Sequence, residues 1–292
     1  MAGLNLWRLR TCLEAVTKFG PGALTYAFAL FTGRQTTKLN LSGVGEVEVR
    51  VRDSDLMCFN QVFNDPYEPE SPAHRDRLKA HYRALLAAKR RPVIIDAGAN
   101  IGAASLWFAS NFPEALVISV EPSPVSAQLL RTNTSARANI LVVEAGLGGS
   151  AGHIALNTGE DSWADRTQRS ASGGIEIVTI GGLLEKAGPD ASLFVVKIDV
   201  EGFEADVFSG DLSWIGVPTK PWDGGPAAIY VEPHDWMLPD GGSSKSFQAA
   251  LCGKGLELLI RGENLIFVRE SASLLPSPLP RRTTTNVDQS LA

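Results

Sequence analysis

The chain has few of the patterns that indicate a zinc finger, a disulfide scaffold or a nucleic-acid-binding protein. Its three cysteines are scattered, none lies in a Cys-x-x-Cys pair, and its four histidines show no zinc spacing. An odd number of separated cysteines predicts reduced thiols and a cytoplasmic location. The net charge is −5 and no basic run is longer than residues 89–91, so nothing favours nucleic acid as a partner.

The sequence also lacks a hydrophobic run long enough to cross a membrane. Residues 22–31 are apolar, but Glu14 and Lys18 interrupt the stretch before them, and a span needs about 20 continuous apolar residues. No small-x-small cleavage site follows a continuous apolar core, which argues against a signal peptide. We expect residues 5–32 to form two short helices, broken at residues 20–22, that pack on the main domain. A peripheral membrane contact through this segment stays open.

Two nucleotide-binding motifs are absent as well. A Gly-x-Gly-x-x-Gly motif would need a glycine where Asn100 stands, and no Gly-x-x-x-x-Gly-Lys-Ser/Thr run occurs. Instead, the apolar residues 92–95 lead into Asp96, a glycine-bearing turn and a helix. Gly98 would permit a sharp turn and the close approach of a ligand, and Gly102 would let the helix start pack tightly on the strand. Asp96 suits a ligand with positive charge or hydroxyl donors.

A second apolar strand, residues 117–120, ends in Glu121, twenty-five residues after Asp96. A carboxylate at this place can accept hydrogen bonds from a ribose diol, as in dinucleotide sites. Pro122 and Pro124 then open a helix, with Ser123 as the expected cap.

A third strand, residues 194–202, ends in charge. Strand alternation would place Lys197, Asp199 and Glu201 on one face, where burial is costly unless the charges are paired or functional. In open α/β sheets, ligands gather beyond the carboxyl ends of the strands, so we expect Asp199 and Glu201 to lie at a binding site. A structural ion pair between Lys197 and a neighbouring carboxylate is the alternative interpretation.

The strand at residues 227–232 repeats this pattern. Tyr230, Glu232 and His234 share a face by alternation, with the polar groups at the carboxyl end. If this strand lies beside the Lys197 strand, then Asp199, Glu201, Glu232 and His234 lie close together at the carboxyl-end edge of the sheet, here called the rim. There they could perform acid–base chemistry.

These segments together resemble the FkbM-type family of S-adenosylmethionine-dependent methyltransferases. The matching motifs are Asp96-Ala-Gly98-Ala-Asn100-Ile-Gly102, Val120-Glu121-Pro122, Lys197-Ile-Asp199-Val-Glu201-Gly202-x-Glu204 and Glu232-Pro-His234-Asp235, with Ser54-Asp55 upstream. The resemblance covers about residues 50–270. One departure is Thr179-Ile-Gly181-Gly182, where the family often has Thr-Leu-Asp, so no role for that aspartate can be carried over.

The resemblance implies a Rossmann-like class I methyltransferase fold: a mostly parallel seven-stranded sheet flanked by helices, with a C-terminal antiparallel hairpin. It also implies a one-carbon transferase that uses S-adenosylmethionine and commonly methylates a hydroxyl. The cofactor-binding residues would be Asp96, Gly98, Asn100, Gly102, Glu121, Gly146 and Asp199. The expected general base is His234, with Asp199 or Glu201 as its partner or as a second base. A magnesium ion, if present, would bind Asp199, Glu201 and Glu232, but we favour a metal-free mechanism.

The chain is expected to divide into a helical extension at residues 1–45, the methyltransferase domain at 46–270 and a disordered tail at 271–292. Residues 157–174 are Gly/Ser-rich and predict a long loop, whose Trp163 either covers the site or is an exposed aromatic of that loop. Residues 256–260 and 264–268 predict the closing hairpin.

The acceptor is expected to be a hydroxyl on a sugar, a glycan or a small metabolite. Two other functions stay open: an NAD(P)-dependent oxidoreductase and a non-catalytic nucleotide-binding module. A reductase would require the missing Gly-x-Gly-x-x-Gly motif and usually a Tyr-x-x-x-Lys pair, which is absent too. A binding module could have lost Glu121 and the charged rim, and this chain keeps both.

Overall fold

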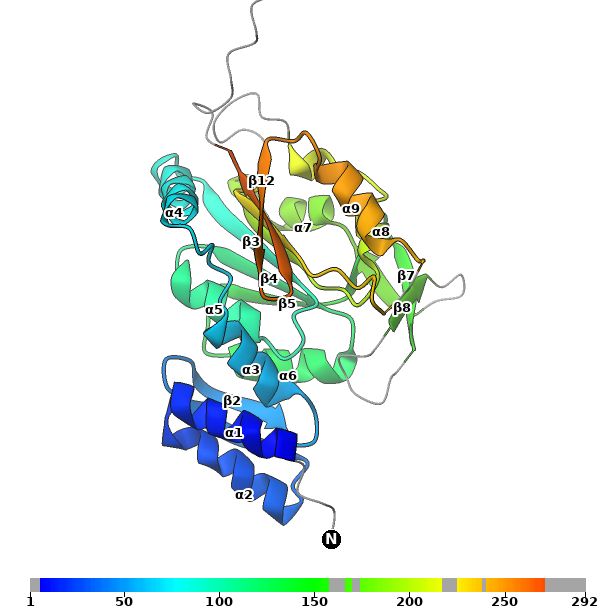
Figure 1. Cartoon of the computed structure of the whole chain (residues 1–292). Helices are drawn as coiled ribbons and strands as arrows, with labels where there is room; N and C mark the ends of the chain where they lie inside the picture. Colours follow the sequence, from blue (N-terminus) through cyan, green and yellow to red (C-terminus); the bar gives the residue numbers. More distant parts are fainter. Residues whose placement is uncertain (1–5, 158–165, 170–173, 217–224, 238–239, 271–292) are drawn as a thin grey trace, which may run out of the picture.

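The computed structural model describes residues 6–157, 166–169, 174–216, 225–237 and 240–270, and it confirms the predicted α/β class. Its centre is a seven-stranded sheet in the order β12-β13-β11-β10-β3-β4-β5 (Figure 1). The strands are β3 (Arg91–Ala97), β4 (Leu116–Glu121), β5 (Ile140–Glu144), β10 (Ala191–Ile198), β11 (Ala228–Val231), β12 (Leu256–Arg261) and β13 (Asn264–Arg269).

Neighbouring strands from β5 to β11 are parallel, whereas β13 is antiparallel to both β11 and β12. The mostly parallel sheet and the C-terminal antiparallel hairpin are thus confirmed. From β3 the chain proceeds outward to β4 and β5, and it then returns to β10 on the other side of β3. The strand order therefore reverses between β3 and β10, and ligands of open α/β sheets bind beyond the carboxyl ends of the strands at such a point.

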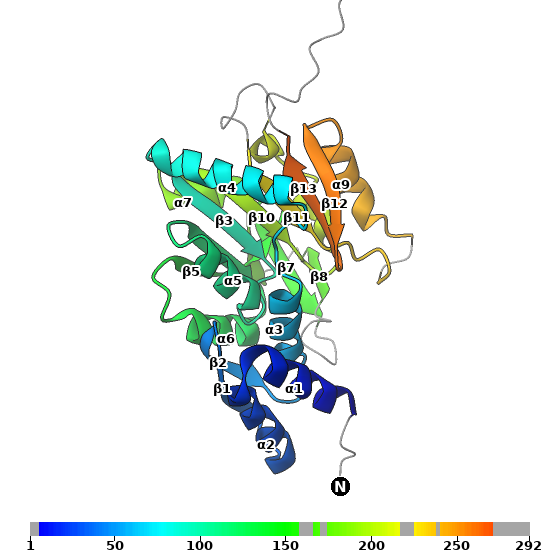
Figure 2. The ribbon, with the colours of Figure 1, turned by 60° about the vertical axis from the view of Figure 1, so that its left-hand side comes forward.

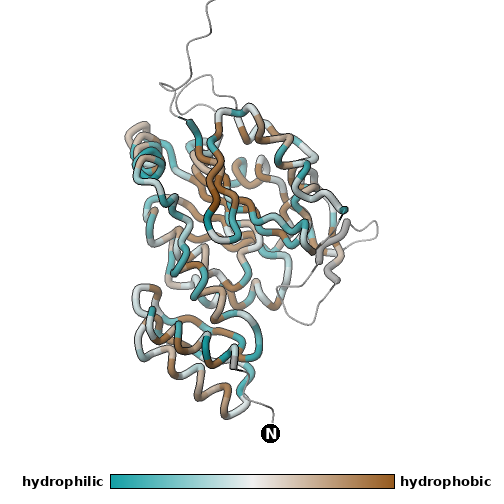
Figure 3. Tube along the Cα trace, viewed as in Figure 1, coloured by the Kyte–Doolittle hydropathy of each residue, from teal (hydrophilic) through white to brown (hydrophobic). Residues whose placement is uncertain are grey.

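Helices cover both faces of this sheet (Figures 1 and 2). On one face, α3 (Asp55–Asn64), α4 (Pro72–Ala87) and α5 (Ala103–Asn111) share a hydrophobic core with Ile94. On the other, α7 (Ile180–Ala187), α8 (Glu204–Val207), α9 (Ser243–Leu251) and the 3₁₀ turn η3 (Ser213–Ile215) share a core with the next residue, Ile95. The central strands β3, β4 and β10 are buried along most of their length because both faces of the sheet are covered, and Figure 3 shows the hydropathy of the residues along the chain.

The residues that precede this domain form a helix pair and a two-stranded sheet, here called the N-terminal unit (residues 6–50), at one end of the molecule (Figures 1 and 2). It comprises α1 (Leu6–Phe19), the 3₁₀ turn η1 (Pro21–Ala23), α2 (Leu24–Thr32), β1 (Thr36–Leu41) and β2 (Gly45–Arg50). The two predicted helices are confirmed, but β1 was not expected. The domain boundary at residue 45 stays a prediction.

α6 (Pro124–Thr134) packs against β2, β4 and β5. Its Asn133 side chain accepts a hydrogen bond from the Glu48 N–H at 2.7 Å and donates to the Glu48 carbonyl at 3.1 Å, which fixes the N-terminal unit to the domain. Ser123 precedes α6 as its cap residue, but its side chain makes no capping bond.

A second, four-stranded sheet has the order β6-β9-β7-β8. Its strands are β6 (Gly146–Leu147), β7 (Gly152–Asn157), β8 (Arg166–Arg169) and β9 (Ile175–Val178). The prediction of a continuous loop over residues 157–174 is wrong at 166–169, because β8 pairs antiparallel with β7. Trp163 and the tail at 271–292 lie outside the described residues.

The charged strand is shorter than predicted. β10 ends at Ile198, and the chain then turns with positive φ angles at Glu201 (50°) and Gly202 (91°) before α8 begins. The expected alternation of Lys197, Asp199 and Glu201 on one strand face is therefore wrong beyond Ile198.

Cys12, Cys58 and Cys252 are free thiols, as expected. Among the helices that the structure describes, none combines the length and hydrophobicity needed to span a lipid bilayer. The cytoplasmic location stays a prediction.

Candidate active site

A cavity of about 610 Å³ lies at the carboxyl ends of β3, β4, β10 and β11. This is the size of a typical small-molecule site. The predicted residues that line it are Gly98, Asn100, Glu121, Gly146, Asp199, Glu201, Glu232 and His234. Two predicted cofactor residues, Asp96 and Gly102, are not in its wall.

Asp96 is fully buried and faces the protein interior. Its carboxylate lies 3.1 Å from the Lys197 ammonium and accepts a hydrogen bond from the Ser105 hydroxyl at 2.6 Å. The expectation that Asp96 contacts a ligand is therefore corrected, because its charge is already paired inside the protein. Its partner Lys197 also lies 3.2 Å from Asp199 and donates to the Gly98 carbonyl at 3.0 Å. The structural ion pair considered for Lys197 is present, and it joins the ends of β3 and β10.

The turn after β3 is sharp at Gly98, as expected, and its glycines also allow close contacts within the protein. Gly98 has a φ of 72°, and a Cβ atom there would collide with the Asp199 carbonyl. The backbone that approaches it closely is thus that of the loop after β10. A Cβ on Gly102, which has a φ of 98°, would lie 2.8 Å from Leu130 of α6, so the close packing here is helix against helix and not helix against strand.

Glu121 ends β4 and is positioned by backbone donors. Its two oxygens accept hydrogen bonds from the Asn100 N–H at 2.8 Å and the Ser123 N–H at 2.9 Å. Burial raises the pKa of Glu121 to about 7, against the lowering effect of these two donors. The carboxylate is 7% exposed and lines the cavity, where its remaining lone pairs can accept hydroxyl donors.

The predicted cluster of acids and His234 is brought together at the rim. His234 is almost fully buried, and its Nδ1 lies 2.6 Å from a carboxylate oxygen of buried Glu204. Its Nε2 lies 3.3 Å from Glu201, 3.7 Å from Asp199 and 3.9 Å from Glu232. One histidine thus bridges an inner carboxylate and a group of acids that line the cavity.

The charges of this cluster shift one another's pKa values. Burial by itself lowers the pKa of His234, but the hydrogen bond to Glu204 and the charges of Asp199 and Glu201 outweigh it and raise the pKa to about 9. Burial, with the nearby Asp199 carboxylate, raises the pKa of Glu201 and of Glu232 to about 8 each. The cluster can therefore gain or lose protons close to neutral pH.

The arrangement of this cluster can be compared with the predicted magnesium ligands. One ligand atom each from Asp199, Glu201 and His234 lies within 4.8 Å of the other two, a spacing that suits a metal ion. This group includes His234, where we expected Glu232. Glu232 still contributes a carboxylate oxygen 3.9 Å from the His234 ring.

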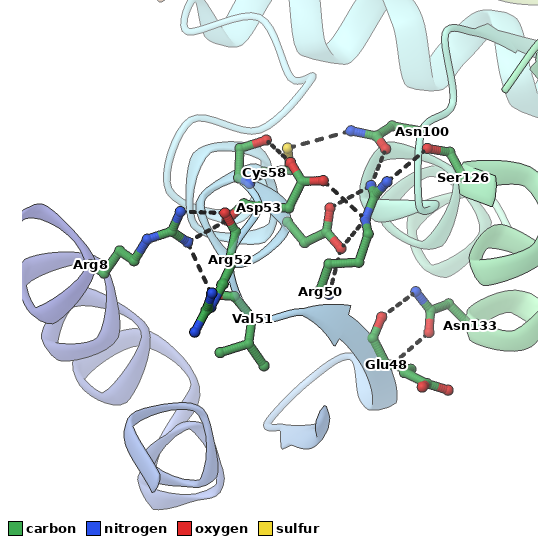
Figure 4. Close-up of polar contacts among 12 residues, drawn as sticks. Arg8, Glu48, Arg50, Val51, Arg52, Asp53, Cys58, Asn100, Ser126 and Asn133 are labelled. Carbon is green, nitrogen blue, oxygen red and sulfur yellow. Dashed lines mark hydrogen bonds and ion pairs between the residues drawn. The ribbon is translucent and has the colours of Figure 1, made fainter. Parts of the chain in front are cut away.

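Sequence reasoning missed Arg50, the last residue of β2, which reaches from the N-terminal unit to the turn after β3 (Figure 4). Its guanidinium donates to both oxygens of fully buried Asp55 at 2.7 and 2.9 Å, and to the Asn100 side-chain oxygen at 3.2 Å. It also donates to the Ser126 hydroxyl at 3.3 Å (Figure 4). No local pattern marks Arg50 in the sequence, although Asp55 belongs to the motif that resembles the family.

A further wall of the cavity was also missed. It comes from α3, from the loop after β11 and from the turn between β12 and β13. These lining residues are Met57, Cys58, Gln61, Val62, Trp236 and Glu263. Gln61 donates to Glu263 at 2.8 Å, which joins the two sides of the wall.

A sequence model of the methyltransferase FkbM domain matches residues 96–247, more than half of the chain. The chain belongs to the FkbM methyltransferase family. The match begins at Asp96 and contains the turn after β3, Glu121, the Lys197 strand and the His234 cluster.

The methyltransferase sdnD of Sordaria araneosa is 26% identical over 155 residues, which cover 41% of this chain and 60% of that protein. The chain thus matches less than two thirds of the relative's length.

Two solved structures were compared. The precorrin-6y C5,15-methyltransferase from Geobacter metallireducens is 13% identical, covers 66% of this chain and 88% of its own, and has a TM-score of 0.34. The Methanococcus jannaschii fibrillarin pre-rRNA processing protein is 14% identical, covers 62% and 68%, and has a TM-score of 0.36. Similarity this low carries no argument about substrate or mechanism.

Proposed function

We propose that this FkbM methyltransferase transfers a methyl group from S-adenosylmethionine to a hydroxyl oxygen. The observation that carries the proposal is the single cavity at the reversal of strand order, which is lined both by Glu121 and by the His234 cluster. The same cavity thus offers a hydrogen-bond acceptor and groups that can take up a proton.

The lining residues fit S-adenosylmethionine chemically. Glu121 is held by two backbone donors and suits a ribose diol. Leu147, Ile154 and Phe203 supply apolar surface for a base, next to Gly146. Asp199 brings negative charge, and a cationic ligand would favour the ionised form of Glu201, whose pKa is raised to about 8. S-adenosylmethionine, when bound, supplies an activated methyl group on a positively charged sulfur.

The residues of the rim would then guide the hydroxyl proton. The cluster would take up the proton that the acceptor hydroxyl loses when it is methylated. His234 is our candidate for the base, with Glu204 holding its Nδ1 so that Nε2 faces the cavity. Glu201 is the candidate for a second base, since its carboxylate lies 3.3 Å from that nitrogen.

We favour a metal-free reaction. Both ring nitrogens of His234 face carboxylate oxygens, an arrangement in which a protonated ring can supply the positive charge that the acids need. A bound magnesium ion would instead use the carboxylates and the histidine of this group. Treatment with EDTA is expected to leave turnover unchanged, and activity that is lost and then restored by Mg²⁺ would show the opposite.

The acceptor is proposed to be an uncharged hydroxyl compound such as a sugar, a glycan or a small metabolite. Asp199 and Glu263 line the cavity and would repel an anionic acceptor, and Glu201 and Glu232 add to this repulsion as they ionise above their raised pKa of about 8. Trp236, which is 69% exposed at this wall, offers a flat apolar surface against which a sugar ring could stack.

The decisive experiment is calorimetry of the purified chain with S-adenosylmethionine, S-adenosylhomocysteine and NAD(P)H, followed by incubation with a labelled methyl donor and extracts. Saturable binding of the first two ligands and a labelled product support the proposal. Binding of the nicotinamide alone would favour an oxidoreductase. Cofactor binding without any labelled product would favour a non-catalytic module.

A further inference from the structure

The outermost helix of the N-terminal unit presents a hydrophobic stripe to solvent. Along α2, Leu24 is 53% exposed, Phe28 is 60% exposed and Phe31 is 83% exposed. The spacings of four and three residues place these side chains on one face of the helix. Tyr26 and Ala29 of the same helix are buried against the rest of the unit, so α2 is apolar both on its buried face and on the exposed face.

One basic side chain lies directly beside this stripe. The Arg34 guanidinium lies 5.8 Å from the centre of the Phe28 ring. Residues 1–45 contain five basic side chains and one acidic one, a net charge of +4, and the chain total of −5 therefore leaves −9 for residues 46–292. The charge of the chain is thus divided between a basic end and an acidic domain, a pattern associated with anionic surfaces as partners.

From the exposed stripe, the adjacent Arg34 and the net positive charge of residues 1–45 we propose that α2 docks on the surface of an anionic lipid bilayer. Leu24, Phe28 and Phe31 enter the boundary between headgroups and acyl chains, and Arg34 contacts the lipid phosphates. Such a helix lies in the plane of the membrane at a depth of about 5–10 Å and does not cross it. This agrees with the nine-residue length of α2.

A lipid surface fits this stripe better than a protein partner does. Three apolar side chains supply only about a few hundred Å² of surface, whereas each partner in a stable protein complex buries about 800 Å². Shallow membrane binding requires only one apolar face and nearby cations, and each basic residue near the surface contributes to it. The stripe also lies on the outer helix of the molecule, away from the central sheet (Figures 1 and 2).

The test is co-sedimentation of the full chain with vesicles of phosphatidylcholine alone and of phosphatidylcholine with phosphatidylglycerol. We expect binding to the anionic vesicles, weaker binding to the neutral ones, and a decrease as salt is added. The double variant Phe28→Ser/Phe31→Ser should bind roughly tenfold more weakly or worse. Arg34→Glu should weaken binding to anionic vesicles roughly fivefold while it leaves neutral vesicles unaffected.

A matched control is Leu258→Ser/Ile260→Ser, which removes two exposed apolar side chains of β12, 55% and 71% exposed, and should retain vesicle binding. Unchanged thermal midpoints and unchanged calorimetric binding of S-adenosylhomocysteine would show that each variant is folded, so failure here is separable from failure of the proposed reaction. The proposal is overturned if the wild type does not bind anionic vesicles, or if both double variants lose vesicle binding to the same extent. It is also overturned if Phe28→Ser/Phe31→Ser abolishes self-association and not vesicle binding.

Discussion

At the scale of single residues, Glu121 connects cofactor binding to pH. Its carboxyl is held by the backbone of Asn100 and Ser123, and burial raises its pKa to about 7. Only the ionised form accepts hydrogen bonds from a diol through both oxygens, so protonation should weaken cofactor binding. The empty protein should show the opposite dependence in its stability. Because the pKa in the folded state lies above its ordinary value of 4.5, stability is lost as pH rises from about 4.5 to 7.

We therefore predict that the affinity for S-adenosylhomocysteine falls as pH is lowered from about 8 to 6. In Glu121→Gln, affinity should be weaker by roughly tenfold, as for a lost hydrogen bond to a charged group, and nearly independent of pH. Calorimetry across this range measures both quantities, with the exposed Glu185→Gln as a control that should behave as the wild type. A pH slope that persists in Glu121→Gln would assign the titration to another group.

His234 is the second residue whose role can be tested by its titration. If the neutral ring is the base, turnover should rise with pH toward about 9, the raised pKa of His234. Removal of Glu204 as hydrogen-bond partner should lower this pKa, so Glu204→Gln should move the rising limb of the pH–kcat profile to lower pH. His234→Ala should lose turnover but keep cofactor affinity. Wild-type turnover in His234→Ala would exclude His234 as the base and leave Glu201 as the candidate.

At the scale of elements, the turn after β3 and the loop after β10 form one packed unit. Lys197 pairs with Asp96 on one strand and Asp199 on the other, and the Asp199 carbonyl occupies the space beside Gly98. A displacement of the turn after β3 would therefore also displace the loop after β10, and both segments shape the cavity.

Gly98→Ala should destabilise the protein by about 2–4 kcal/mol, from strain at positive φ and collision with the Asp199 carbonyl. Gly181→Ala is the matched control, since nothing lies within 4 Å of the added methyl in α7, and it should raise stability by about 0.5–1 kcal/mol. Urea denaturation measures both changes. Equal effects of the two substitutions would contradict the close approach at Gly98.

β2 acts on the cofactor turn through its last residue. Arg50→Met leaves the buried Asp55 carboxylate without its partner, which should cost about 3–5 kcal/mol of stability. The double variant Arg50→Met/Asp55→Leu should recover much of this loss, because no unpaired charge remains. Arg52→Met, on the exposed neighbouring side chain, should change stability by no more than about 0.5 kcal/mol. If chemical denaturation gave the same result for Arg50→Met and Arg52→Met, the Arg50–Asp55 pair would not stabilise the fold.

At the scale of the whole molecule, the hydrophobic core is shared across the expected domain boundary. One cluster of buried residues extends from Cys12 in α1 to Val268 in β13. We therefore predict that the chain unfolds in a single cooperative transition in calorimetry, although it was expected to divide at residue 45. Two separated transitions would show that the N-terminal unit folds by itself, and added S-adenosylhomocysteine would then shift only the one that contains the cavity.

The sequence predicts much of this architecture because buried parallel strands read as short apolar runs, and Glu121 stands directly after such a run. The sharing of the rim by Asp199, Glu201 and His234 follows from the same reasoning, since the carboxyl ends of parallel strands meet. The contacts of Asp96 with Lys197 and of Arg50 with Asn100 could not be predicted, because a side-chain contact across fifty or a hundred residues leaves no local pattern. β10 ends before the predicted residue, and the chain then turns with a positive φ at Glu201. No sequence pattern at Glu201 predicts this conformation.

The guanidinium of Arg50 connects the N-terminal unit to the turn that positions Glu121. It belongs to the N-terminal unit, yet it touches Asn100, whose N–H in turn holds Glu121. Whatever energy this contact transmits must act equally in both directions. A cofactor that orders the Asn100 turn would thus reduce the mobility of the β1–β2 hairpin. A surface that immobilises this hairpin would increase the affinity for the cofactor by the same factor.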